Sequence, residues 1–318
     1  MEHNSMRKQS PVRKPGFTLI EMAIVLVIIG LAAAMLLTAG SAMLDNQRRK
    51  AVRAQLDTLD NAMAQFVAVN KRLPCPADGH LPVVSPTLGV EVVDAGGTCN
   101  AAAIPNGILP WVTLGLSRAD IVDPWGGYMT YRVDPALAAA APQPLLMNMS
   151  NCDPSATGAA GAGGICITPA PPCTGTAGCT SPASFLANKG IDIWDGQNGA
   201  AGFAARQNNR ILGTGAAYVI ISHGPNGLGA YNTSAVLQNG DGIAIKLETT
   251  NRNNTPMSFP ATQASVILDA PLNDNLSLEA TPPGPPPPPT REFYFDDYLS
   301  HPTIMTVLNK ANLGPRAH

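Results

Sequence analysis

The chain has 318 residues, of which 45% are hydrophobic and 13% are charged, so it can bury a core and is not kept disordered by charge repulsion. Aromatic residues make up only 5%, while Gly and Pro number 30 each, which indicates a modest core with long, turn-rich loops. Residues 1–72 hold ten Lys/Arg against five Asp/Glu, whereas residues 73–318 hold ten against seventeen. The acidic remainder argues against nucleic acid as a partner.

The chain opens with a short basic segment followed by an apolar run. Residues 1–16 carry four Lys/Arg, and the only charge within residues 17–39 is Glu21. As a helix this run would be about 35 Å long, enough to span a hydrocarbon core of about 30 Å. A signal anchor or a secretory signal peptide is the plain alternative, but neither explains the carboxylate. A charge inside a bilayer costs on the order of 2–3 kcal/mol, so Glu21 predicts a functional role.

An amphipathic pattern continues the helix beyond the apolar run. Apolar residues recur at intervals of four and three, at Val52, Leu56, Leu59, Met63 and Phe66. Pro74 and Pro76 prevent easy continuation. We therefore expect one helix over about 17–70, with residues 17–39 in a membrane or filament core. Residues 40–72 would be its amphipathic continuation and the spine of a globular head.

Residues 73–318 are expected to form this head, as short strands joined by long loops. Aromatic and β-branched runs predict strands, and a weaker apolar pattern predicts a helix: strands at 128–133, 217–222, 242–248 and 291–295, and the helix at 302–311. The proline-rich stretch 280–290 is expected to be an extended polyproline spacer. The predicted fold class is α+β, with a long N-terminal helix packed on a small antiparallel sheet that carries long disulfide-bearing loops.

Six cysteines lie in the head, at Cys75, Cys99, Cys152, Cys166, Cys173 and Cys179. The basic segment places the head on the periplasmic or outer side of a membrane, where disulfides persist. Six cysteines allow fifteen connectivities, and the sequence does not choose among them. We expect one bridge between Cys75 and Cys99 and two bridges within 152–179, in a Cys-rich loop at 150–185. Free structural thiols are the alternative.

The chain contains none of the common motifs of catalysis. A nucleophile elbow G-x-S-x-G, a zinc motif H-E-x-x-H and a phosphate-binding glycine loop ending in Lys are all missing from the sequence. Ser222 and His223 are adjacent on a predicted strand, so their side chains would point to opposite faces. The sequence therefore predicts a protein that is not an enzyme.

The junction Lys14-Pro15-Gly16-Phe17-Thr18-Leu19-Ile20-Glu21 resembles the processing site of type IV prepilins and type II secretion pseudopilins. The resemblance implies that a prepilin peptidase removes residues 1–16, cutting between Gly16 and Phe17, and methylates the new amino group of Phe17. It also implies that Glu21 pairs with the N-terminal amine of a neighbouring subunit during assembly on an inner-membrane platform.

A second resemblance lies in the head, where three segments follow the order found in major pseudopilins: 123–126 (Asp-Pro-Trp-Gly), 222–227 (Ser-His-Gly-Pro-Asn-Gly) and 296–298 (Asp-Asp-Tyr). About seventy residues separate the last two, far more than is usual in that family. The resemblance implies a calcium site formed by Asp296 and Asp297 with the region of Ser222 and Asn226. Calcium is the only cofactor suggested, and a solvated acidic turn is the alternative.

These features predict a structural subunit, a minor pilin or pseudopilin, of a type IV pilus or a type II secretion filament. It would cross the inner membrane once, with a cytoplasmic N-terminus and a periplasmic head, before joining a filament. The alternative is a pilin-like binding module whose inserted loops recognise a surface, a secreted substrate or DNA, the acidic head making DNA the least expected. The sequence leaves open which filament system it serves and in what copy number.

Overall fold

The computed structural model describes the following residues of the chain: 18–100, 107–138, 146–161, 164–167, 179–187, 189–191, 193–194, 215–238, 244–245, 248, 251–252, 267–268, 290–291 and 294–317. Within the first helix, the side chains of residues 32–42 lie outside this set. The predicted leader 1–16 and most of the proline-rich stretch 280–290 lie outside it as well. The chain divides into two compact units, Met1–Arg49 and Lys50–His318, which are described separately.

The first unit contains the beginning of helix α1, which spans Leu19–Asn70. Ten large apolar side chains between Leu19 and Leu31 are each at least 47% exposed, and they point to all sides of the helix. In the part of the chain that the structure describes, no helix is both long enough and apolar enough to cross a membrane. The predicted membrane segment 17–39 lies partly outside the described residues.

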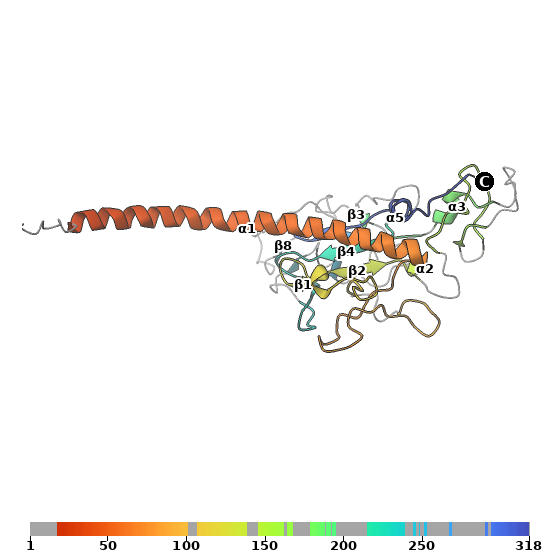
Figure 1. Ribbon diagram of the computed structural model, residues 1–318, viewed down its shortest axis with the longest axis horizontal. Coiled ribbons are helices and arrows are strands. Elements are labelled where there is room, and N and C mark those ends of the chain that lie inside the picture. Colours follow the sequence, from red (N-terminus) through yellow and green to blue (C-terminus); the bar gives the residue numbers. More distant parts are fainter. Residues whose placement is uncertain are drawn as a thin grey trace, which may run out of the picture. The chain divides into compact units, whose positions relative to one another are not determined.

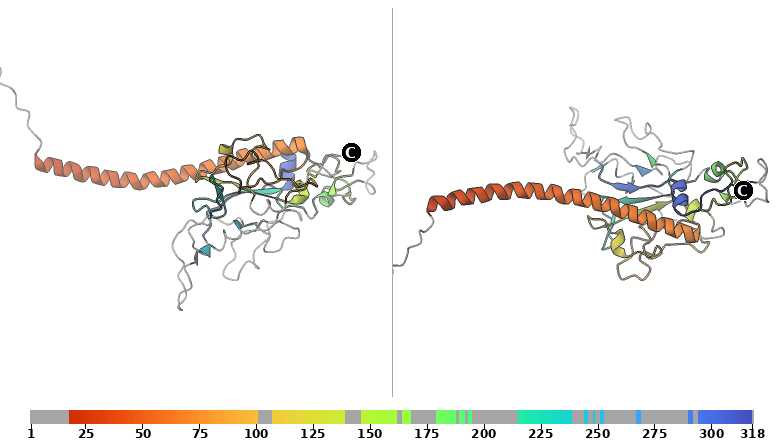
Figure 2. Two further views of the ribbon diagram at one scale, coloured as in Figure 1. Left: turned by 90° about the horizontal axis from the view of Figure 1, so that it is seen from below. Right: turned by 45° about the horizontal axis from the view of Figure 1, so that its top comes forward.

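The second unit is built on a three-stranded antiparallel sheet with the order β2-β4-β9. Strands β2 (Thr130–Val133), β4 (Tyr218–Ser222) and β9 (Tyr298–Ser300) come from distant parts of the sequence. The part of α1 from Lys50 onward lies along one face of this sheet (Figure 1). Figure 2 shows the sheet between this helix and the short strands β6 to β8, which the segment between β5 and β9 contributes.

The amphipathic face of α1 forms the main core together with the sheet. Val52, Leu56, Leu59 and Met63 are at most 5% exposed, as the periodicity predicted. Phe66 is only half-buried, and Val67, one position further, is fully buried in its place. On the sheet, Tyr131, Tyr218 and Ile220 belong to the same cluster. The expectation of a mixed α+β protein is confirmed.

The other elements are short, as the many Gly and Pro residues imply. They comprise η1 (Arg118–Ile121), β1 (Gly127–Tyr128), α2 (Pro135–Ala138), α3 (Pro182–Leu186), β3 (Ile193–Trp194), β5 (Tyr231–Asn232), β6 (Ala244–Ile245), β7 (Ile267–Leu268), β8 (Thr290–Arg291) and α5 (Ile304–Lys310). Strand β1 pairs antiparallel with β5, whereas β3 pairs parallel with β7 and β6 parallel with β8. The Thr303 hydroxyl accepts a hydrogen bond from Thr306 N and begins α5 as an N-cap.

Three predicted strands differ from those observed. In the run 291–295, Arg291 ends β8, and Tyr294 and Phe295 belong to no named strand, whereas the sheet strand β9 comes after this run and was not predicted. The run 128–133 is divided between β1 and β2, because the backbone groups of Met129 bond to Ile121 and Leu109 instead of to a strand of the sheet. Of the run 242–248, only Ala244–Ile245 is described as a strand, and its parallel partner β8 lies outside the β2-β4-β9 sheet. Alternation of apolar and polar residues marks a half-buried strand but does not say which sheet it joins.

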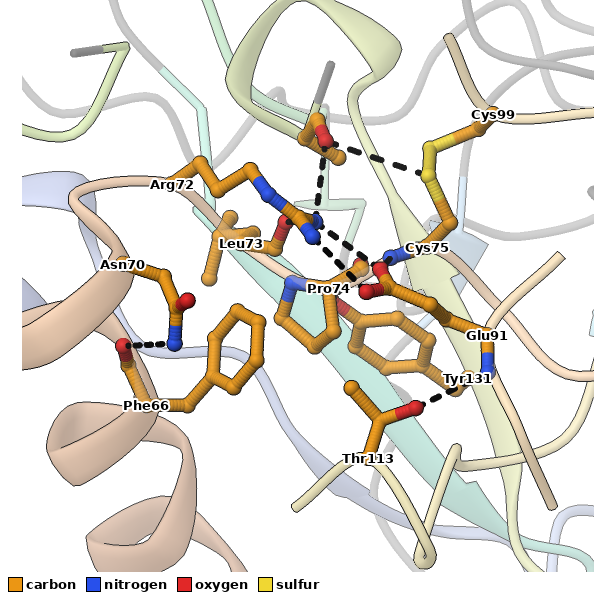
Figure 3. Close-up of polar contacts among 11 residues, drawn as sticks. Phe66, Asn70, Arg72, Leu73, Pro74, Cys75, Glu91, Cys99, Thr113 and Tyr131 are labelled. Atoms are coloured by element: carbon orange, nitrogen blue, oxygen red, sulfur yellow. Dashed lines mark hydrogen bonds and ion pairs between the residues drawn. A yellow bond between two sulfur atoms is a disulfide. The ribbon is translucent and has the colours of Figure 1, made fainter. Parts of the chain in front are cut away.

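The loop after α1 is held by a disulfide and an ion pair (Figure 3). A bond joins Cys75 to Cys99, the pairing expected for this loop. Arg72 Nη1 and Nη2 contact the two oxygens of the Glu91 carboxylate, at 2.8 and 2.7 Å, and each side chain is only 12% exposed. Glu91 Oε2 also accepts a hydrogen bond from Cys75 N at 2.9 Å. One carboxylate therefore fixes both the end of the helix and the disulfide.

The head carries further disulfides, so the expectation of disulfide-bearing loops is confirmed. Cys152 is bonded to Cys166, within the predicted Cys-rich loop. Cys179 is disulfide-bonded as well, and Cys173 lies outside the described residues. No described cysteine is a free thiol. Bridges of this kind typically stabilise a loop by about 2–4 kcal/mol.

Asp60 connects α1 to two strands of the sheet, and we expect its loss to destabilise the head. Its carboxylate accepts hydrogen bonds from the Tyr218 hydroxyl at 2.8 Å and the Ser300 hydroxyl at 2.6 Å. Asp60→Ala should lower the free energy of unfolding by about 2–3 kcal/mol, since the buried tyrosine hydroxyl loses a charged acceptor. Urea unfolding measures this, with the exposed Asp57→Ala on the same helix as a control that should stay within about 0.5 kcal/mol. Equal effects of the two substitutions would contradict the prediction.

Candidate functional site

The first candidate site is the start of α1. Gly16 and Phe17 lie outside the described residues, so the described chain begins at Thr18. Glu21 Oε2 accepts hydrogen bonds from Thr18 N and from the Thr18 hydroxyl, both at 2.8 Å, and Glu21 N donates to that hydroxyl at 3.3 Å. This reciprocal arrangement is a capping box, which satisfies backbone donors at the helix N-terminus. Glu21 is exposed, so its carboxylate is accessible to a partner.

The second candidate site is a cluster of three buried carboxylates in the head. Glu248, Asp296 and Asp297 each offer one oxygen within 4.8 Å of the others. They are 0%, 3% and 2% exposed, respectively. Acidic side chains are almost never fully buried unless a partner compensates their charge. Three of them together therefore need a compensating group.

Hydrogen bonds from the turn after β4 and from Tyr294 hold the cluster on one side. Asp296 Oδ2 accepts from the Tyr294 hydroxyl at 2.6 Å and from Asn226 N at 3.2 Å. Glu248 Oε1 accepts from Asp296 N at 2.7 Å, and Glu248 Oε2 accepts from the Asn226 amide. The turn thus positions two of the three carboxylates.

Contacts with His223 and Asn251 complete the surroundings. Asp297 Oδ2 accepts from the Asn251 amide at 2.8 Å, and Asp297 Oδ1 lies 3.4 Å from His223 Nδ1. The other ring nitrogen of His223 is 2.9 Å from the Thr130 hydroxyl. Among the described residues, Asp296 Oδ1 and Asp297 Oδ1 have no hydrogen-bond donor. These two oxygens are therefore the ones that most need a ligand.

The electrostatics of the cluster favour a cation. Burial raises the pKa of Glu248, and the neighbouring Asp297 and Asp296 raise it further. Burial also raises the pKa of Asp296, with Asp297 adding to the effect. A shift in this direction means that the site resists carrying three negative charges. A divalent cation would relieve this repulsion and give the two oxygens a ligand.

The donor set fits a hard divalent cation. The three carboxylates offer oxygens, which Ca²⁺ and Mg²⁺ prefer, whereas zinc favours Cys and His. Calcium takes six to eight oxygens in flexible geometry, so backbone carbonyls or water would have to add to the three carboxylates. Among the described residues the cluster has three carboxylates and no thiolate, and for this reason it resembles a calcium site more than a transition-metal site.

The structure brings together most of the residues that the sequence marked as a metal site, but Ser222 has another partner. Asn226 contacts the cluster through its backbone and its amide. The Ser222 hydroxyl instead donates to Asp123 Oδ2 at 2.7 Å. Asp123 also accepts from the backbone of Trp125 and Gly127, so Ser222 ties the Asp-Pro-Trp-Gly turn to β4.

Sequence reasoning missed Glu248 and Asn251 as members of this site, and it marked His223 only as part of the motif 222–227. Glu248 was only the last residue of a predicted strand, and Asn251 carried no motif. Their contacts with Asp296 and Asp297 join residues that are 48 and 46 positions apart in the sequence. No local spacing encodes such a contact. The only usable signal was a glutamate in a stretch with few other charges.

Comparison with known proteins adds one match. Residues 12–37 match the family model of the prokaryotic N-terminal methylation motif. The chain therefore carries the signature of type IV pilins and pseudopilins at its N-terminus, and the head is not covered by the match. Searches of curated proteins and of solved structures found no match.

Proposed function

We propose that this chain is a structural subunit, a minor pilin or pseudopilin, of a type IV pilus or type II secretion filament. A prepilin peptidase would cut it after Gly16 and methylate Phe17, and its helix would then pack among those of other subunits. The single observation that carries the proposal is the N-terminal methylation motif at residues 12–37. This signature belongs to structural proteins, and no observation in the described residues favours the binding-module alternative.

The exposed surface of α1 supports assembly. A helix that is apolar on all sides needs a membrane or other helices around it, and residues 19–31 have this character. The precursor would be anchored in the inner membrane with its head in the periplasm, and an assembly platform would transfer it to the filament. There its apolar surface would pack against the same surface of its neighbours.

Glu21 would set the position of each subunit in the filament. Cleavage creates a positive amine on Phe17, and a carboxylate in an apolar core needs such a partner. The capping contacts with Thr18 hold Glu21 at the very start of the helix. From there it can meet the amine of an adjacent subunit.

The experiment is to express Glu21→Ala beside the wild type and examine processing and assembly. Mass spectrometry of the mature N-terminus should find methylated Phe17 in both proteins. Incorporation into filaments should fall at least about tenfold in Glu21→Ala, because an unpaired buried amine costs several kcal/mol. Thr18→Ala is the control, since it removes the cap but keeps the carboxylate, and it should assemble. Wild-type incorporation of Glu21→Ala would reject the pairing role, and a mature terminus elsewhere would reject the processing.

We also infer that the carboxylate cluster binds calcium in the assembled head. The support is the set of three buried carboxylates and the two oxygens without a donor among the described residues. Asp296 and Asp297 would hold the ion, with the turn at Asn226 positioning Asp296. Bound calcium would neutralise the cluster and so strengthen the C-terminal part of the head.

A further inference from the structure

The segment between β5 and β9 contributes one of the three carboxylates. We call residues 239–293 the inserted segment, and of its described residues Glu248 alone belongs to the cluster. Asp296 and Asp297 begin three residues after the end of the inserted segment and lead into β9. The cluster therefore joins two parts of the chain that are far apart in sequence.

A second contact of the inserted segment leads to the sheet. Asn251 donates its side-chain amide to Asp297 Oδ2 at 2.8 Å, and its backbone carbonyl accepts from Arg132 Nη2 at 3.3 Å. Arg132 lies on β2 and is 2% exposed. Alternation along the strand places Arg132 and Thr130 on one face and Tyr131, which packs with the helix, on the other. Asn251 therefore docks on the face of the sheet that is turned away from α1.

In contrast to Asn251, Glu248 is held mainly by groups that also touch the acidic pair. Its partners are Asp296 N and the Asn226 amide, and its charge lies beside two other carboxylates. Without a cation this contact brings like charges together in a buried place, which opposes docking. With a divalent cation the same geometry becomes attractive.

We propose that the cation bound by Asp296 and Asp297 also binds Glu248 and thereby fastens the part of the chain at Glu248 and Asn251 to the outer face of the sheet. This inference rests on the calcium site proposed above. Loading the site and docking the segment around Glu248 are then one event. Glu248 and Asn251 would then be docked on the sheet only where calcium is plentiful, as it is outside the cytoplasm.

Glu248→Gln tests the inference without removing the fold. The amide keeps an acceptor for Asp296 N and removes a negative charge from a crowded site, so the calcium-free variant should be at least as stable as the wild type. Calcium affinity, measured by titration calorimetry on the full chain in detergent, should fall at least about tenfold. Asp94→Asn, which changes an exposed loop carboxylate, is the control and should bind as the wild type does.

Limited proteolysis supplies the second readout. In the wild type, calcium should protect the peptide bond after Arg252 from trypsin at least about fivefold relative to chelator, and in Glu248→Gln this protection should disappear. Wild-type affinity and protection in Glu248→Gln would overturn the inference while leaving the calcium site in place. Protection that does not depend on calcium in the wild type would overturn it too. A wild-type chain that binds no calcium would reject the calcium site itself.

Discussion

Replacing Glu91 by alanine should lower the free energy of unfolding by about 3–5 kcal/mol, although the residue lies in a loop. Its carboxylate makes a two-point contact with Arg72 and accepts from the backbone of Cys75. Removing it leaves a guanidinium that is 12% exposed without its anion, and a buried N–H without its acceptor. The cost of an uncompensated buried charge exceeds that of a lost surface ion pair, which is about 1 kcal/mol or less.

A double-mutant cycle separates this explanation from a general weakness of the loop. Urea unfolding would be measured for Glu91→Met, Arg72→Met and the pair together. Because two apolar side chains leave no buried charge behind, the double variant should be more stable than Glu91→Met alone. The exposed pair of Asp45 and Arg48, 3.9 Å apart, gives the comparison, and Asp45→Ala should cost about 1 kcal/mol at most. Additive effects at 72 and 91 would reject the prediction.

Local features of the fold could be predicted from the sequence, whereas contacts such as the ion pair of Arg72 and Glu91 could not. The buried face of α1 followed from the spacing of Val52, Leu56, Leu59 and Met63, because helix periodicity is a local property. Strand β4 followed from its β-branched residues. Arg72 and Glu91 gave no signal, since they are 19 residues apart and meet only when the loop closes.

Some residues of the candidate metal site could likewise be predicted from the sequence, and others could not. Asp296 and Asp297 stood out because two adjacent acids are conspicuous in a stretch with few charges, and Asn226 because it sits in a turn motif. Glu248 could not be found, since its place depends on how the inserted segment packs on the sheet. Ser222 belonged to the motif, but its hydroxyl donates to Asp123, which lies 99 residues earlier in the sequence. A sequence motif can identify candidate residues, but tertiary packing decides which of them lie close enough to bind one ligand.

Gly224→Ala should damage both the stability of the head and the proposed calcium site. Gly224 has a φ of +57°, and a Cβ at this position would lie 2.9 Å from Asp296 Cγ and closer still to the Asp296 carbonyl oxygen. The left-handed backbone alone costs alanine about 1–2 kcal/mol. Overpacking against Asp296 adds about 1–3 kcal/mol, because backbone cannot move aside as a flexible side chain does. The expected loss is therefore about 3 kcal/mol.

Gly115→Ala is the matched control for this steric argument. Its φ of +71° imposes similar strain, but no described atom lies within 4 Å of the added Cβ. It should therefore cost about 1–2 kcal/mol and leave calcium binding unchanged. Urea unfolding of both variants, with calcium and with chelator, gives the two costs and the stabilisation that calcium adds. If displacement of Asp296 is the cause, calcium should stabilise Gly115→Ala as it does the wild type and should stabilise Gly224→Ala much less. Equal costs and equal calcium effects would mean that the turn at Gly224 does not position the acidic pair.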